Sequence, residues 1–289
     1  DVVSELNGPP NIPQTVQIGG KTYPVEELAV RMFEGEGESL IKNITAITLP
    51  EGLKRLEKNS LYSEVVSATE VTIPASVEYV GTYFLRGETL KKITFKGSPV
   101  LADNSVGTNY KLIHFMSQTP PSVGKYSFQS AHLMVVAPDV ASIPVYRTTL
   151  SGHWGVEKGY ELSVYGGLKE ADNVYYSAME DGNACAIYFD GTQTSVALSK
   201  TIQIDGAARA LAKIQRGLFY YKNITEVIVP ETVKTIGGNA FYKCSALTSL
   251  QLPSGVEEIG DYAFYECSAL AIDVTLPGLK TLGKGAFQI

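Results

Sequence analysis

Cysteine and histidine, the residues that most often carry metal or nucleophilic chemistry, are rare in this sequence. Its 289 residues include three of each. His114, His132 and His153 are far apart, no Cys-x-x-Cys pair occurs, and no cysteine–histidine spacing matches a zinc site. A Ser-His-Asp or Cys-His site could still assemble from distant positions, but the Gly-x-Ser-x-Gly sequence of a nucleophile elbow is absent. We therefore expect no catalytic residue, no metal site and no cofactor.

An acidic segment is the other candidate for metal binding. Glu34, Glu36 and Glu38 alternate with glycine. Alternating carboxylates can bind calcium, but the Asp-x-Asp-x-Asp-Gly order of a calcium loop is missing. A solvated loop is the interpretation that we adopt.

Charge and hydropathy narrow the class of protein. Hydrophobic residues make up 44% of the chain, charged residues 19%, and the net charge is −6. This is enough apolar material for a core. No apolar stretch approaches the ~20 residues of a membrane span, and no basic stripe of a nucleic-acid-binding protein is present.

The C-terminal third contains a repeat. From Pro230 the chain follows the pattern P-x-x-V-x-x-I-G-x-x-A-F-x-x-C-x-x-L-x-x-L-x-L. The copy from Pro253 repeats most of it, and the copy from Pro277 repeats its first part up to Ala286-Phe287. A weaker form begins at Pro50 and Pro74. Residues 15–20 (TVQIGG) also match residues 201–206 (TIQIDG), which indicates a larger tandem duplication.

The repeat predicts a solenoid. Its closing L-x-L alternation is typical of a short strand, and the following proline ends that strand. The three-residue spacing of the remaining apolar positions suits tight 3₁₀-like or short helical turns, and we expect the glycine after Ile to supply an unusual backbone angle. One unit cannot bury its apolar positions alone, so units must stack. We expect an α/β, β-rich, right-handed solenoid with one parallel sheet.

These residues resemble the BspA-type leucine-rich repeat of bacterial surface proteins. The resemblance is strongest over 211–289 and weaker over 25–116. It implies an exported or surface-anchored protein, located outside the cell or on its outer surface, whose relatives are discussed as adhesins and interaction proteins. A lipid anchor, if there is one, would lie outside this sequence.

Composition and turn signals divide the chain further. An Asp-Gly turn at Asp181-Gly182 between two β-rich runs predicts a hairpin, and Tyr146 and Trp154 are similar to the residues that close such arrays. The expected organisation is an extended tail (1–13), a first array with its closing segment (14–160), a linker (161–172), and a hairpin cap plus second array (173–289).

Outward strand positions are the first candidate binding surface, because solenoids generally bind partners across the sheet. The alternation places these side chains outward: Thr48, Thr72, Thr94, then Met116 in the first array, and Glu226, Ile228, Ser249, Gln251 and Thr275 in the second. The alternative is a threonine ladder present for its β propensity alone.

A row of tyrosines is the second candidate. Tyr220, Tyr242 and Tyr265 each follow the phenylalanine position of the repeat, and Tyr62 has the same register. Tyrosine offers contact area with a polar tip. The alternative is mutual stacking that only covers neighbouring turns.

Two cysteines share one repeat position. Cys244 and Cys267 should therefore stack in the core as small buried hydrophobes. A disulfide between them would need Cα atoms within ~7 Å. Cys185 has no partner under either interpretation.

Three functions remain open from the sequence. The first is a non-catalytic surface protein that binds a host or microbial protein or glycan through the sheet face. The second is a structural spacer in a surface assembly. The third is a hydrolase with a site at the inter-array junction, around residues 139–190.

Overall fold

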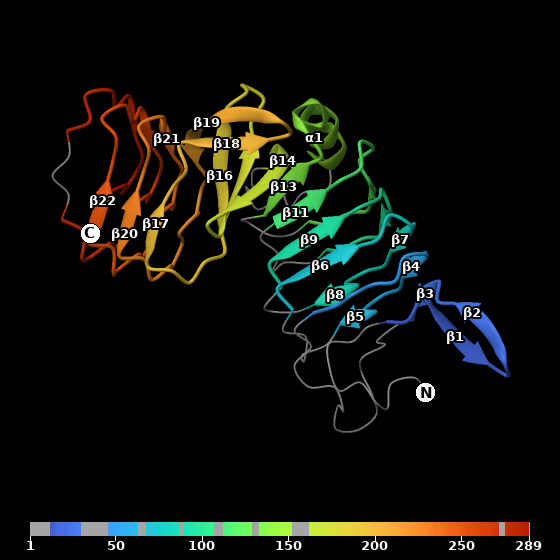
Figure 1. Ribbon diagram of the computed structural model, residues 1–289. Coiled ribbons are helices and arrows are strands. Elements are labelled where there is room, and N and C mark those ends of the chain that lie inside the picture. Colours follow the sequence, from blue (N-terminus) through green and yellow to red (C-terminus); the bar gives the residue numbers. More distant parts are fainter. Residues whose placement is uncertain are drawn as a thin grey trace. The chain divides into compact units, whose positions relative to one another are not determined.

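The computed structural model describes residues 12–29, 46–62, 68–86, 90–106, 112–128, 133–151, 162–271 and 275–288 (Figure 1). The chain divides into two compact units. Unit 1 comprises residues 1–138 and 142–164, and unit 2 comprises residues 139–141 and 165–289.

Unit 1 is a stack of coils, most of which contribute two short strands to two separate parallel ladders. The first ladder runs in the order β6 (Glu70–Ile73), β9 (Lys92–Phe95), β11 (Leu112–Phe115), β13 (Met134–Ala137). The second ladder runs in the order β3 (Glu27–Leu28), β4 (Arg55–Leu56), β7 (Tyr79–Val80), β10 (Val100–Leu101), β12 (Ser122–Val123). The other described strands of unit 1 form two pairs. One is a hairpin of β1 (Thr15–Ile18) and β2 (Lys21–Pro24), and the other is a parallel pair of β5 (Leu61–Tyr62) and β8 (Leu85–Arg86).

A short helix covers the core of unit 1 next to β11. After the 3₁₀ turn η1 (Val140–Ser142), helix α1 (Ile143–Ser151) buries Tyr146 against Phe115, with ring centroids 5.4 Å apart. The Tyr146 hydroxyl donates a hydrogen bond of 2.7 Å to the carbonyl of Ser117. The closing role that we expected of Trp154 falls outside the described residues.

Unit 2 begins with an antiparallel meander and continues as parallel coils. The meander consists of β14 (Ser163–Ala171), β15 (Val174–Ala178) and β16 (Ala184–Phe189). One parallel ladder follows with β17 (Ser195–Ala197), β20 (Glu226–Ile228) and β22 (Ser249–Gln251). The other joins β16, β19 (Ala207–Ile214), β21 (Thr235–Ile236), β23 (Glu258–Ile259) and β24 (Thr281–Leu282), and β18 (Thr201–Ile204) pairs with β19 in a hairpin.

The solenoid is confirmed, but the expectation of one parallel sheet is wrong. The isoleucine of the Ile-Gly pair also lies in a strand, as Ile236 pairs in register with Ile259. The side chain of this isoleucine points inward while that of the preceding residue points outward, the alternation of a strand. Two-residue strands are too short for this alternation to appear in the sequence.

The hairpin predicted at Asp181-Gly182 is confirmed. β15 and β16 pair antiparallel, and Gly182 in the turn has φ 86°. The segment expected as a linker, 161–172, contains strand β14. Gly166 and Gly167 mark a β-bulge in this strand, since the pairing register shifts between Gly166 and Leu168.

The repeat glycines serve close approach between coils, not an unusual backbone angle as expected. Gly237 and Gly260 are absent from the residues with positive φ. A Cβ added at Gly260 would lie 2.5 Å from the amide nitrogen of Gly238, and one at Gly237 would lie 2.4 Å from that of Arg216. Any larger residue would therefore push neighbouring coils apart.

The left-handed backbone angles lie two residues further on. Asn239 and Tyr262 have φ 53° and 55°. Their N–H groups donate to the next coil, to the carbonyls of Asp261 and Lys284 at 2.8 and 2.9 Å. The tight turns expected after Ile-Gly are present, with hydrogen bonds three residues apart such as that from Cys244 N to Phe241 O.

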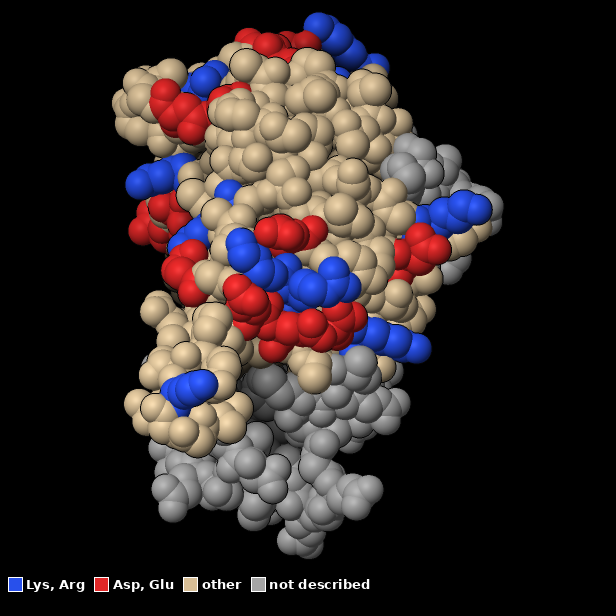
Figure 2. Space-filling view, turned by 90° about the vertical axis from the view of Figure 1, so that its right-hand side faces the viewer, with Lys and Arg blue, Asp and Glu red and all other residues tan. Residues whose placement is uncertain are grey.

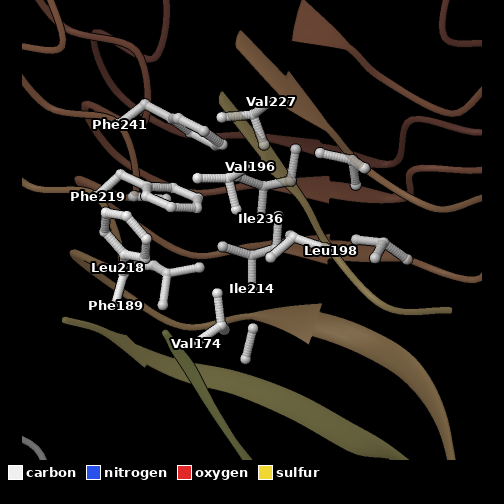
Figure 3. Close-up of a cluster of buried hydrophobic side chains, with 14 of the residues drawn as sticks. Val174, Phe189, Val196, Leu198, Ile214, Leu218, Phe219, Val227, Ile236 and Phe241 are labelled. Carbon is white, nitrogen blue, oxygen red and sulfur yellow. The ribbon is translucent and has the colours of Figure 1, made fainter. Parts of the chain in front are cut away.

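The core of unit 2 is organised as columns of identical side chains. Phe219, Phe241 and Phe264 are fully buried and stack with centroids 5.1 and 5.0 Å apart. Figure 3 shows the first two of these rings beside Ile214 and Ile236 of the ladder strands. Each coil thus completes its hydrophobic core with its neighbours, as the stacking argument requires.

Candidate functional site

The outward row of unit 1 is regular and lies on adjacent strands. Thr72 of β6 is in register with Thr94 of β9, which is in register with His114 of β11. Thr48 is exposed, and the residue before it, Ile47, bridges to Val71. Thr48, Thr72 and Thr94 therefore form one row on the solvent side of the sheet, as predicted.

The predicted continuation of this row through Met116 is wrong. Met116 N donates to Phe95 O and Lys96 N donates to Ile73 O, so Met116 lies one row further, level with Lys96. Ile93 lies 22 residues after its partner Val71, but Ile113 lies only 20 residues after its partner Ile93, so a constant repeat length gives the wrong register. His114 takes the position instead.

His114 stays neutral at physiological pH. Burial lowers the pKa of its imidazole to about 4, and the positive charge of Lys92 adds to this effect. A neutral imidazole offers one hydrogen-bond donor and one acceptor. The row thus presents uncharged polar groups.

An open recess of about 730 Å³ lies at the first coils of this face. Thr48, Thr69 and Thr72 line it, together with Glu70 and the segment 12–14. Lys96, which also lines it, forms an ion pair of 2.9 Å with Glu51. The recess therefore contains two threonines predicted from sequence and a further one that the alternation had not singled out.

The outward face of unit 2 carries the other predicted residues in two rows. Glu226 is in register with Ser249, and Ile228 with Gln251. Ser195 of β17 extends the first row and donates a hydrogen bond of 2.8 Å to the Glu226 carboxylate. Thr275 is exposed but lies in no strand. These rows bring four predicted residues together on one sheet.

Several exposed charges in each unit are paired with opposite charges. In unit 1 Lys54 lies 3.3 Å from Glu78, and in unit 2 Lys280 lies 2.6 Å from Glu257. The hydrogen bond from Lys280 lowers the pKa of the Glu257 carboxyl. On the face shown in Figure 2, acidic and basic side chains are intermingled.

The predicted tyrosine row forms a stack. The rings of Tyr220 and Tyr242 lie 5.1 Å apart at 17°, and those of Tyr242 and Tyr265 lie 4.9 Å apart at 9°. These rings cover one another's faces, as the stacking alternative anticipates. Tyr220 keeps 40% of its surface exposed. The fourth expected member, Tyr62, has a side chain outside the described positions.

Tyr221 was missed by the sequence reasoning. It has φ 56° and is 57% exposed, and its ring meets that of Tyr220 at 4.7 Å. The Lys243 ammonium lies 5.4 Å from the Tyr221 ring centroid and 3.3 Å from Glu266. Lys243 and Glu266 also have left-handed backbone angles, with positive φ. This shared repeat position, four residues after Asn239 and Tyr262, was the signal available in the sequence.

The cysteines are structural. All three are buried free thiols. Cys244 and Cys267 donate hydrogen bonds of 3.0 Å to the carbonyls of Phe219 and Phe241, one coil back. Burial raises the pKa of Cys244 to about 12 and that of Cys267 to about 11, so both stay protonated and unreactive.

Within the ranges that the structure describes, no group of three or more His, Cys, Asp or Glu side chains is arranged to hold a metal ion. The same ranges contain no helix with the length and hydropathy needed to cross a bilayer. The acidic residues Glu34, Glu36 and Glu38, and the histidines His132 and His153, lie outside the described residues.

Comparison with known proteins agrees with the repeat pattern. A family model described as the BspA type leucine-rich repeat region matches residues 39–135 and 212–289, in six copies. No protein with a curated description matches the sequence.

Several solved structures are similar to the chain. One is a leucine-rich repeat protein from Bacteroides capillosus, with 23% identity, a TM-score of 0.39, and coverage of 42% of this chain and 91% of that one. The pneumococcal vaccine antigen PcpA has 18% identity, a TM-score of 0.40, and coverage of 94% and 67%. A leucine rich cell surface protein from Faecalibacterium prausnitzii has 18% identity, a TM-score of 0.39, and coverage of 96% and 79%.

Proposed function

The chain belongs to the BspA-type leucine-rich repeat family, and from this premise we propose that it is a non-catalytic binding protein. It acts outside the cell or at the cell surface, and it recognises a protein or glycan partner through the outward face of its strands. Family membership supports the location and the general class of function.

The observation that carries the proposal is the in-register row of Thr72, Thr94 and His114 on three adjacent strands. Hydroxyl and neutral imidazole groups can each donate and accept hydrogen bonds. Their strands are fixed by parallel pairing over a buried core, which includes Val71, Ile93 and Ile113. A surface held in this way loses little conformational freedom when a partner binds.

An enzymatic role has less support. The neutral His114 is the one histidine among the described residues, and the described cysteines are buried with raised pKa values. Catalytic groups need a cleft and a proton donor or acceptor near its working pKa. On the described part of the sheet face, neither His114 nor a cysteine lines the recess.

The test is binding of the purified chain to arrays of host matrix proteins and glycans. Thr72→Arg and Gln251→Arg place a long cation on the outward face of a ladder in each unit. Thr22→Arg is the matched control, because Thr22 is an exposed threonine of the β1–β2 hairpin and not of the sheet face.

The proposal expects a saturable ligand whose binding is weakened by Thr72→Arg or Gln251→Arg, while Thr22→Arg binds as the unchanged protein does. All variants must retain the far-ultraviolet circular dichroism of the parent. A complete absence of ligands would instead favour a spacer role, and turnover of a ligand would favour an enzyme.

A further inference from the structure

The recess at the first coils of unit 1 has the chemistry of a site for uncharged, hydroxyl-rich ligands. Its volume of about 730 Å³ lies within the range of ~300–1,000 Å³ typical of small-ligand sites. Three of its lining residues are threonines, Thr48, Thr69 and Thr72. Each hydroxyl both donates and accepts a hydrogen bond, which matches the bonding capacity of a sugar hydroxyl.

Charged side chains around the recess form ion pairs with one another or with neighbouring residues of the protein. The Lys96 ammonium lies 2.9 Å from the Glu51 carboxylate, and both residues line the recess. Glu70, on the same wall, forms an ion pair with Lys92 of the neighbouring strand. An anionic or cationic ligand would have to replace one of these pairs, whereas a neutral ligand can use the same atoms as hydrogen-bond partners.

Half of the fourteen lining residues are apolar, and several of these expose little surface. The side chains of Ile47, Leu49 and Val71 are buried in the core and leave at most 8% of their surface exposed. Ile12 and Pro13 provide apolar surface from the N-terminal segment. The lining therefore combines hydrogen-bonding groups with apolar surface, and the carbon-bearing face of a sugar ring can contact the apolar part.

We propose that this recess binds a neutral oligosaccharide through hydrogen bonds to Thr48, Thr69 and Thr72. The inference rests on the proposed binding role of the unit 1 face and specifies its ligand class. Free sugars and the glycans of glycoproteins share this chemistry, and a test with isolated oligosaccharides and with glycoproteins distinguishes the two sources.

The experiment is isothermal titration calorimetry of the full chain with hits from an array of neutral oligosaccharides, and with sulfated, acidic and amino sugars as comparison. Thr72→Val removes one hydroxyl but keeps the β-branched shape that suits a strand. Thr22→Val is the matched control, since Thr22 is an exposed strand threonine of the β1–β2 hairpin that lies outside the sheet face and does not line the recess. Thr72→Ser restores the hydroxyl.

The expected result is neutral-sugar binding that Thr72→Val weakens by about tenfold, the effect of about 1.4 kcal/mol of lost hydrogen bonding. Thr22→Val should change the affinity less than about twofold, and Thr72→Ser should recover most of it. Because the ligand carries no charge, raising the salt concentration should leave the affinity unchanged.

Three results would overturn the inference: no neutral oligosaccharide binds, charged sugars bind in preference, or Thr72→Val and Thr22→Val weaken binding equally. A protein ligand that is lost with Gln251→Arg, in the absence of any sugar binding, would reject this inference and leave the proposed function standing. Loss of all ligands would reject both. Thermal unfolding of each variant excludes misfolding as the cause.

Discussion

The aromatic column inside unit 2 gives the most quantitative prediction. Phe241 is fully buried, with ring centroids 5.1 Å from Phe219 and 5.0 Å from Phe264. Truncation of a buried phenylalanine to alanine costs about 3–5 kcal/mol of unfolding free energy, because a cavity is left that the surroundings only partly fill. Phe241→Ala should therefore lose about 4 kcal/mol.

The next residue along the chain provides the control. Tyr242 is also stacked on both sides, with centroids 5.1 and 4.9 Å from Tyr220 and Tyr265, but it is only half-buried. Its truncation removes three aromatic pairs, with Tyr220, Tyr221 and Tyr265, of about 0.5–1.5 kcal/mol each. Tyr242→Ala should lose about 1.5–2 kcal/mol, the lower part of the summed range, because solvent reaches the rings.

The assay is urea unfolding followed by far-ultraviolet circular dichroism, with the slope of each transition compared between variants. A changed slope would indicate that the coils no longer unfold as one unit. Equal losses for Phe241→Ala and Tyr242→Ala, or a loss below about 2 kcal/mol for Phe241→Ala, would refute the claim that inward columns supply the stability between neighbouring coils.

Three further predictions concern single positions. Gly260→Ala should destabilise by about 1–3 kcal/mol in the same urea assay, because its Cβ would lie 2.5 Å from the backbone of Gly238, whereas Gly278→Ala, with its nearest atom at 3.5 Å, should be tolerated. Ser105→Ala should be neutral or stabilising in thermal unfolding, since the fully buried Ser105 hydroxyl has no hydrogen-bond partner among the described residues; a loss above about 1 kcal/mol would contradict this. His114 has a folded pKa of about 4, below the ~6.5 of an unfolded histidine, so the unfolded state binds its proton first as pH falls. Unfolding free energy should drop by about 3 kcal/mol between pH 7 and pH 4 on this account, and His114→Gln should remove that part of the pH dependence; an unchanged pH profile would contradict the assignment.

Local alternation was the part of the fold most readable from sequence. Val71 and Ile73 point inward and Thr72 outward because a strand has a period of two, and the same rule placed Glu226 and Gln251. The repeat spacing predicted stacking for the same reason. Register across coils was less certain, because a single short coil moved Met116 away from the row that His114 occupies.

Interactions between coils were harder to predict from the sequence. The close approach at Gly260 depends on the backbone of the preceding coil. The sequence of a single repeat therefore shows that a glycine is present but not why a larger residue would not fit. The recess could not be predicted from the sequence either, because the segment 12–14 that forms part of its lining is remote in sequence from Thr48 and Thr72. Tyr221 was missed because its exposure follows from a left-handed backbone angle that no propensity rule expects for tyrosine.

The central claim, that the outward faces of the strands form the working surface, is tested most directly by one comparison. The Thr72→Arg/Gln251→Arg double variant and the Thr22→Arg control are applied side by side to the same arrays of matrix proteins and glycans. We predict that the control binds the ligands of the unchanged protein and that the double variant binds none of them while its unfolding temperature is retained. An unchanged set of ligands for the double variant would contradict the account.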